Sequence, residues 1–316
     1  METLVQELRL SLRRLLARPG LTGAAALTLA LGIGANTAVF SLVRGILLEP
    51  LPYGAPDRLV MIWKPGRDTD QTWLSLREWL EYSRSTRSFE QLAAYTTTEV
   101  NLTEGSDPER VRAGFTTPNA FAALGVSALQ GRTFAANEGT AQSNVVVIGH
   151  DLWQRRFAGA ADLVGRTIRV NGIARTVIGI MPASFRLPLD YREEHPTELW
   201  LPDNTDAAAA GQFGNRSYFV YGHLRPGVTA SAATADLDAV GRQWQAAGYI
   251  DNADGRLDRA AIPINTLLTG SLRPMLLLLF GAVGFVLLIA CANVTNLLLA
   301  RSDSRRREVA TQAALG

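Results

Sequence analysis

The longest uncharged stretch of the chain constrains its fold more than any other feature. Residues 274–300 lie between Arg273 and Arg301, and none of these 27 residues carries a charge. A helix rises about 1.5 Å per residue, so this stretch would reach roughly 40 Å and cross a hydrocarbon layer of about 30 Å. A core helix of a soluble protein would show a polar face over such a length. The stretch therefore predicts a transmembrane helix over residues 274–300.

Basic residues follow this stretch directly, and they are Arg301, Arg305, Arg306 and Arg307. A cluster of this kind marks the cytoplasmic side of a membrane. Helix-forming residues continue after it, and Val309, Ala313 and Leu315 could form the apolar face of a short cytoplasmic helix within residues 301–316. The open alternative is a solvated basic flank that only fixes the orientation of the span.

The start of the chain also predicts membrane association. Residues 1–18 place leucines on one helical face and Glu7, Arg9 and Arg13 on another, as in a helix that lies in the membrane interface. The uncharged run that follows, over residues 19–43, is longer than the core of about 7–15 residues in a signal peptide. We therefore expect residues 19–48 to form a first transmembrane helix; the charged start of a signal peptide is the alternative for residues 1–18.

Small and amide-bearing residues recur in both expected spans. They are Gly32, Gly34 and Asn36 in the first, and Gly281, Gly284, Asn293 and Asn296 in the second. Small residues let helices approach closely, and asparagine can hydrogen-bond across the contact. We expect these residues to pack the helices on protein; the alternative is that they line a pathway.

The charge distribution predicts the topology. Residues 49–273 carry 22 basic and 25 acidic side chains, a net charge of −3, whereas both ends of the chain are basic. Both termini should therefore be cytoplasmic, with residues 49–273 outside the inner membrane, in the periplasm of a bacterium with two membranes. A slightly acidic domain argues against nucleic acid as a partner. Cys291 is the only cysteine, so no disulfide can stabilise the outer domain.

Residues 49–273 predict an α+β domain. The expected strands are 59–63, 92–98, 109–116, 145–148, 217–224 and 262–264, with a tight hairpin at Asn171–Gly172. The expected helices are 75–85, a short one after residue 117, one reaching Trp153, and one through Ala246 that Thr229 or Ser231 caps. Strand–helix–strand units near 59–98 and 217–265 would form one subdomain, with residues 118–215 inserted as a second.

Catalytic motifs are absent from the sequence. It has no G-x-x-x-x-G-K-[ST] phosphate loop, no G-x-S-x-G nucleophile turn and no H-E-x-x-H pair. The three histidines are isolated, and Glu193, Glu194 and His195 fall in an expected solvated loop. Five tryptophans of the outer domain are expected in its core: Trp73, Trp79, Trp153, Trp200 and Trp244. We expect a protein without catalytic, metal or cofactor sites, and no ATP hydrolysis by this chain.

Several motifs resemble one family across nearly the whole chain. They are Ala35–Phe40, Leu124–Val126, Gly131–Phe134, Leu224–Val228, Cys291–Arg301 and Arg307–Gly316. With the order of interfacial helix, span, outer domain, span and basic helix, the sequence resembles the N-terminal half of a MacB/FtsX-type ABC transporter permease. The run at Cys291 is most similar to the large duplicated orphan permeases of soil bacteria.

The resemblance implies separate roles for parts of the chain. It implies a porter-like subdomain at 57–116 plus 216–265, an inserted strand-rich subdomain at 117–215, and a coupling helix at 301–316. That helix would dock on a cytoplasmic ABC ATPase subunit through Arg305, Arg306, Arg307, Glu308, Val309, Ala313 and Leu315. Further implied partners are membrane lipid, a second permease half or dimer partner, and a periplasmic protein.

Two departures from the family pattern concern the end of the chain. The family usually has arginine near the position of Gln312, and it continues into two further spans. A gene fragment or truncated product is therefore an expectation. The implied function is export or mechanotransmission driven by the ATPase. The alternatives are a membrane-tethered periplasmic binding or adaptor protein without transport, and a membrane-anchored hydrolase, against which the missing motifs argue.

Overall fold

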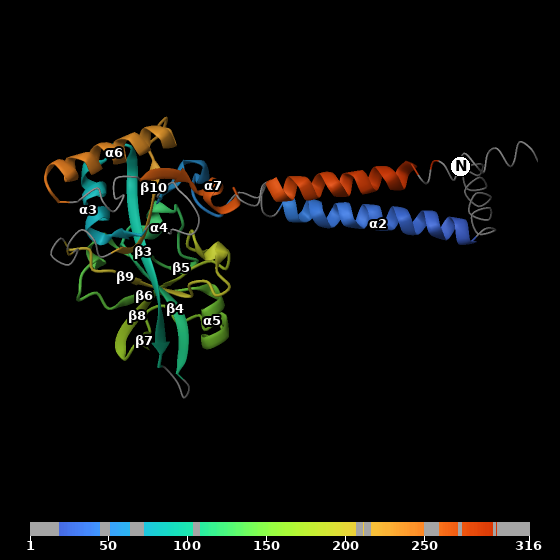
Figure 1. Ribbon diagram of the computed structural model, residues 1–316. Helices are drawn as coiled ribbons and strands as arrows, with labels where there is room; N and C mark the ends of the chain where they lie inside the picture. The colour runs from blue at the N-terminus through green and yellow to red at the C-terminus, as the bar shows by residue number, and fades with distance from the viewer. Residues whose placement is uncertain are drawn as a thin grey trace, which may run out of the picture. The chain divides into compact units, whose positions relative to one another are not determined.

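The computed structural model describes residues 19–44, 51–63, 73–103, 108–206, 211, 216–249, 259–270, 274–292 and 295. The chain forms two compact units (Figure 1): Met1–Glu49 together with Thr269–Gly316, and Pro50–Leu268. The predicted helices over residues 1–18 and 301–316 lie outside the described residues.

The first unit contains a pair of long apolar helices. Helix α2 spans Pro19–Val43 and holds no acidic or basic residue in its end turns. The second helix, Pro274–Ala292, has a mean hydropathy of 2.8 and is the one helix in the described part of the chain that is long and apolar enough to cross a membrane. Its side chains are largely exposed, among them Leu278 at 76% and Phe285 at 69%. In α2 the same criterion finds the shorter apolar helix Ala30–Ser41, so the first span stays a prediction.

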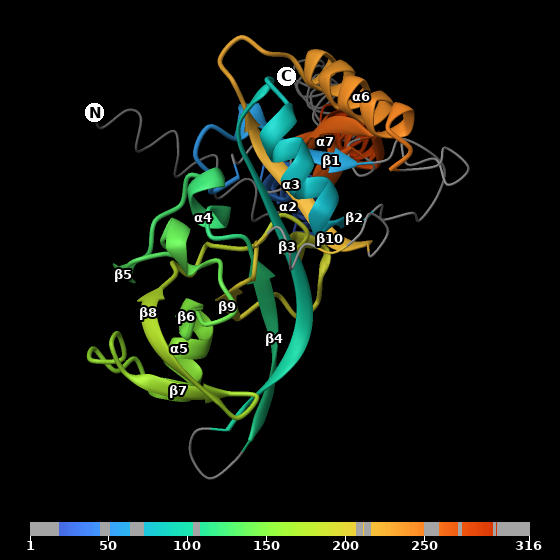
Figure 2. The same ribbon diagram turned by 90° about the vertical axis from the view of Figure 1, so that its left-hand side faces the viewer.

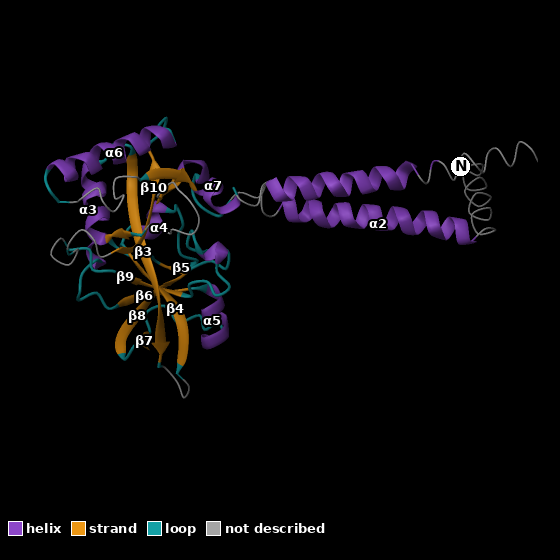
Figure 3. Ribbon diagram, viewed as in Figure 1, coloured by secondary structure: helices purple, strands orange, loops and turns teal. Residues whose placement is uncertain are grey.

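The second unit is built on an 11-stranded mixed sheet, with helices on its surfaces (Figure 3). Its main path runs β11-β1-β10-β3-β4-β9-β6-β8-β5. The bounds are β1 (Leu59–Trp63), β2 (Leu74–Ser75), β3 (Phe89–Leu102), β4 (Glu109–Thr116), β5 (Gln130–Gly131), β6 (Val145–Ile148), β7 (Thr167–Val170), β8 (Ile173–Ile180), β9 (Leu199–Pro202), β10 (Arg216–Leu224) and β11 (Ala260–Pro263). The α+β class predicted for this domain is confirmed.

Strand β3 runs through the whole unit and joins its two ends (Figure 2). Its first half pairs with β10, from Phe89 to Tyr95, and its second half pairs with β4, from Tyr95 to Leu102. The described residues between β4 and β10 form a long insertion that returns to this same sheet: β9 pairs parallel to β4, and β6 pairs with β9.

Helices α3 (Leu76–Ser85) and α6 (Ala230–Ala246) bury one face of the sheet formed by β1, β3 and β10. Ser75 begins α3 with a capping box, in which its side chain accepts from Glu78 N and Glu78 accepts from Ser75 N. Thr229 caps α6 by accepting from Ala232 N, which decides between the two predicted caps. These helices share one apolar cluster with Val60, Ile62, Leu92, Ala94 and Val220.

The opposite face of these strands belongs to a second cluster. Successive residues of a strand point to opposite faces, so Leu59, Met61 and Tyr221 face away from α3 and α6. They pack with Phe121 of α4 (Ala120–Ala123), with Trp200 of β9 and with the loop around Phe185. A third cluster lies between β4, β6, β8, β9 and α5 (His150–Phe157).

Most predicted elements are confirmed, and the main differences concern β9, β3 and Trp73. The Asn171–Gly172 hairpin is present, with both residues at positive φ (50° and 79°), as a two-residue turn between twisted strands requires. Strand β9 was missed because four apolar residues ending at Pro202 give no periodicity. Strand β3 is longer than the predicted 92–98 because residues 99–102 pair with β4. Trp73 is 42% exposed, so its assignment to the core is wrong: it lies just before the two-residue strand β2, against the edge of Phe219.

Candidate functional site

Two of the predicted packing residues lie where α2 and Pro274–Ala292 touch. The Asn36 side-chain amide donates to Gly32 O at 3.1 Å and to Val283 O, on the other helix, at 3.3 Å. Gly32 is buried, and a Cβ at this position would lie 3.2 Å from Leu287 Cδ1. A small residue and an amide thus hold the two helices together at one level.

The other predicted packing residues lie elsewhere. A Cβ added to Gly34, Gly281 or Gly284 would meet no atom of the described residues within 4 Å, so their role in helix packing stays a prediction. Asn293 and Asn296 lie outside the described residues, as do all seven residues predicted to face an ATPase.

The segment that follows the first helix is anchored in the outer unit by Tyr53. Its ring is 6% exposed, and its hydroxyl donates to Arg186 O at 2.8 Å. Burial raises the pKa of Tyr53 well above its usual range, so the hydroxyl keeps its proton and stays a donor. Next to it, Gly54 N donates to Leu124 O at 2.8 Å, and Gly54 O accepts from His223 Nε2 at 2.7 Å. Three segments distant in sequence, at Leu124, Arg186 and His223, therefore hold this segment.

The segment that leads to the second helix is anchored in the same core. Strand β11 pairs with β1, and α7 (Ile264–Thr269) follows it without a break. Ile264 is fully buried, and Leu267 and Leu268 pack against the cluster that also contains Tyr53. We call these two segments, residues 51–55 and α7, the leads to the apolar helices. Both enter one apolar cluster, which contains Phe121 and Trp200.

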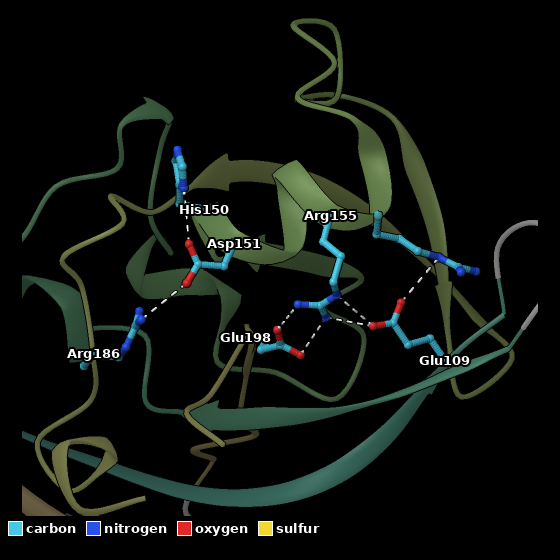
Figure 4. Close-up of polar contacts among 7 residues, drawn as sticks. Glu109, His150, Asp151, Arg155, Arg186 and Glu198 are labelled. Atoms are coloured by element: carbon cyan, nitrogen blue, oxygen red, sulfur yellow. Dashed lines mark hydrogen bonds and ion pairs between the residues drawn. The ribbon is translucent and has the colours of Figure 1, made fainter. Parts of the chain in front are cut away.

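Contacts of Arg186 extend this anchor toward α5 (Figure 4). Its backbone oxygen accepts from Tyr53, and its guanidinium lies 3.3 Å from Asp151 of α5. Asp151 also lies 3.4 Å from His150 Nδ1. The first lead and the inserted part of the sheet are therefore joined by hydrogen bonds as well as by apolar packing.

Figure 4 also shows a second ionic group, centred on Arg155. Arg155 lies 2.7 Å from Glu109 of β4 and 2.8 Å from Glu198, which precedes β9. The hydrogen bonds that Arg155 donates to Glu198 and then to Glu109 raise the pKa of Arg155 above its ordinary value. These groups line a polar cleft of about 490 Å³ in which acidic and basic side chains balance. The ion pairs of Arg155 connect α5 to β4 and to the residue before β9. Each exposed pair contributes only about 0–1 kcal/mol to stability.

The predicted loop Glu193-Glu194-His195 is exposed, and Glu193 pairs with Arg112 at 3.0 Å. The described part of the chain holds no group of three or more His, Cys, Asp or Glu side chains that could bind a metal. The anchoring of Tyr53 was missed from the sequence; the available signal was an aromatic residue set between Pro52 and Gly54, just after the first apolar run.

The family model described as MacB-like periplasmic core domain matches residues 22–240. The chain is 24% identical over 197 residues to the "probable export ATP-binding/permease protein MacB" of Pseudomonas entomophila, and 25% identical over 197 residues to the "probable syringafactin export ATP-binding/permease protein SyfD" of Pseudomonas syringae pv. tomato. Each match covers 62% of this chain and 28% of the relative, so the chain spans less than a third of these relatives' length.

Solved structures of similar domains are also found. The periplasmic region of MacB from Actinobacillus actinomycetemcomitans has a TM-score of 0.48 and 15% identity, over 73% of this chain and 95% of that one. The extracellular domain of the noncanonic ABC-type transporter YknZ from Gram-positive bacteria has a TM-score of 0.44 and 12% identity, over 65% and 99%. Because the family model covers more than half of the residues, the chain belongs to the MacB-like periplasmic core domain family, in line with its resemblance to MacB/FtsX-type ABC transporter permeases.

Proposed function

We propose that this permease passes motion between a cytoplasmic ATPase and its periplasmic domain, for export or for mechanical signalling. Family membership makes it an inner-membrane protein with a periplasmic domain. The proposal adds two spans, at 19–48 and 274–300, with both termini in the cytoplasm and residues 49–273 outside. The ATPase would lie outside these 316 residues, which contain no phosphate loop.

The observation that carries this proposal is the shared anchoring of both leads. Tyr53 and α7 enter one buried cluster, so motion that reached both leads would act on the packing of Phe121 and Trp200. A tethered adaptor needs only a flexible linker and gains nothing from this arrangement. Packed cores resist gradual deformation, so displacement applied at the leads would reach the sheet rather than be absorbed.

Division of the outer domain into two subdomains is part of the same proposal. Residues 57–116 plus 216–265 would form the porter-like part; in support, α3 and α6 share one apolar cluster with β1, β3 and β10. Residues 117–215 would form the inserted part; in support, Arg155 of α5 forms an ion pair with Glu198 within this range. Strand β3 belongs to both, and would transmit motion between them.

The proposed contact with the ATPase lies in residues 301–316. Val309, Ala313 and Leu315 would enter an apolar groove of the ATPase, while Arg305, Arg306, Arg307 and Glu308 meet lipid phosphates or acidic rim residues. An arginine at a lipid surface contributes on the order of 1 kcal/mol, so the apolar contacts should decide binding. A second permease half or dimer partner, and a periplasmic protein, would complete the assembly.

A pull-down with the ATPase subunit from the same genome tests this contact. Leu315→Asp should abolish association, because it places a charge in the apolar groove, whereas Arg306→Gln should weaken it only several-fold. Binding of Leu315→Asp at the wild-type level would refute the coupling-helix assignment.

Hydrogen exchange then separates the permease from the adaptor. In the assembled complex, a non-hydrolysable nucleotide should change the protection of backbone amides in α7 and in residues 51–55. An adaptor without transport should show no such change, even if the ATPase binds it.

A further inference from the structure

A cavity of about 300 Å³ lies against β3, β4 and β10, beside the loop that contains η4 (Asp190–Arg192). Three aromatic side chains line it: Trp73, Tyr95 and Phe219. It shares Tyr95 and Leu189 with the apolar cluster that anchors the leads, and Arg112 with the cleft at Arg155, but nothing in the transmission of motion requires a cavity here.

The rings of this pocket stand at steep angles to one another. Trp73 and Phe219 have ring centroids 6.1 Å apart and an interplanar angle of 85°, so they form adjoining walls and not a flat stack. Tyr95 and Phe219 lie 5.3 Å apart at 40°. Aromatic rings attract cations through their negative faces, and adjoining rings at right angles are how proteins enclose quaternary ammonium groups. The exposure of Trp73 leaves this corner open to a ligand.

The charges at the pocket also favour a cation. Its lining contains two carboxylates, of Asp190 and Glu193, and one guanidinium, of Arg112. Arg112 donates to Glu193 Oε2 at 3.0 Å and to Thr97 Oγ1 at 3.1 Å, so its charge is already paired. The remaining charge is negative, which disfavours anionic ligands.

We propose that this pocket binds a compact organic cation, a quaternary ammonium or a protonated amine, with its charged group in the corner formed by Trp73 and Phe219, near the carboxylates of Asp190 and Glu193 that line the pocket. The volume is at the lower end of the roughly 300–1,000 Å³ range of ligand sites, which limits the ligand to a small molecule or to one head group. This binding does not depend on an ATPase, so its test is independent of the proposed coupling.

Choline and its uncharged isostere 3,3-dimethylbutan-1-ol provide a matched pair of probes, because they share their shape and differ in charge. The full chain is kept in maltoside micelles free of choline lipids, and binding is followed by ligand-observed NMR of the methyl signals. Choline should bind with a Kd on the order of 1 mM, and the alcohol about tenfold or more weakly. Glycerophosphocholine distinguishes the source: binding of choline alone assigns a free cation, whereas binding of both extends the site to a lipid head group.

Substitutions place the binding in this pocket. Trp73→Ala should weaken choline binding about tenfold, while Trp73→Phe, which keeps a ring, should recover most of it. Glu193→Gln should also weaken it, because it leaves the Arg112 guanidinium without its ion pair and so cancels the net negative charge of the pocket lining. Glu90→Gln is its matched control, since Glu90 is equally exposed (38% against 39%) and equally paired with one arginine (3.1 Å against 3.0 Å).

Two results would overturn the proposal. One is equal affinity for choline and the alcohol, which would show an apolar cavity without charge recognition. The other is wild-type choline binding by both Trp73→Ala and Glu193→Gln, which would place the binding elsewhere on the chain or in the micelle.

Discussion

Glu78 and Arg259 form a buried ion pair whose two halves should not be equally important. The two side chains are 2% and 0% exposed, and Arg259 Nη2 lies 3.5 Å from Glu78 Oε1. Arg259 Nε and Nη1 have no hydrogen-bond partner among the described residues. The Glu78 carboxylate, in contrast, also accepts from Ser75 N at 2.6 Å as part of the capping box of α3. The arginine is therefore poorly satisfied, and the glutamate is well satisfied.

This asymmetry predicts different losses of stability. Glu78→Gln leaves an unpaired buried guanidinium, which should lower the free energy of unfolding by about 3–5 kcal/mol. Arg259→Met also breaks the pair, but it removes two unsatisfied buried donors, each of which costs about 1–3 kcal/mol. Its net loss should therefore be about 1–2 kcal/mol, and the double variant should be close to Arg259→Met alone.

Denaturant unfolding of the full chain in maltoside micelles measures these differences. Trp79 and Trp244 lie in the same apolar cluster as α3, so their fluorescence reports this part of the domain. Removal of the exposed pair Arg58–Glu90, which is 35% and 38% exposed, is the control and should cost at most about 1 kcal/mol. A larger loss for Arg259→Met than for Glu78→Gln would refute the reasoning, because it would mean that the guanidinium makes strong bonds.

Three further predictions use single substitutions. Tyr53→Phe should lower the free energy of unfolding by about 1 kcal/mol in the same assay, because a buried carbonyl loses its donor, whereas Tyr82→Phe should be neutral or slightly stabilising, because its buried hydroxyl has no partner. Gly32→Leu should weaken the helix pair, measured by energy transfer between labels on the two helices, while Gly34→Leu, which has open space, should leave it intact. Arg132 donates hydrogen bonds to Glu138 and holds the pKa of that carboxyl below its usual value. The stabilising effect of this pair is therefore present above the usual pKa and is lost as the pH falls through the folded pKa. Wild type and Glu138→Gln should then converge in stability in acid; a constant difference at all pH values would contradict this.

The sequence alone determined the features that depend on neighbours along the chain. The charge-free run over 274–300 predicted an apolar helix because length and composition suffice for that inference. Asn171–Gly172 predicted its hairpin because few residues accept positive φ, and Thr229 was one of two predicted caps because a hydroxyl there can bond the first turn. Family motifs distributed over the chain identified the permease before any contact was known.

Only the tertiary structure decided the features that join distant segments. Strand β9 is held by β4 and β6, and the second half of β3 by β4, so neither length is encoded locally. Tyr53 finds its acceptor 133 residues away, and Glu78 its partner 181 residues away. Trp73 looked like a core residue because tryptophan is usually buried, yet the edge position of β2 leaves it in the wall of a pocket. Packing of one element on another decides such burial, and a local pattern cannot encode it because the partner is chosen only when the chain folds.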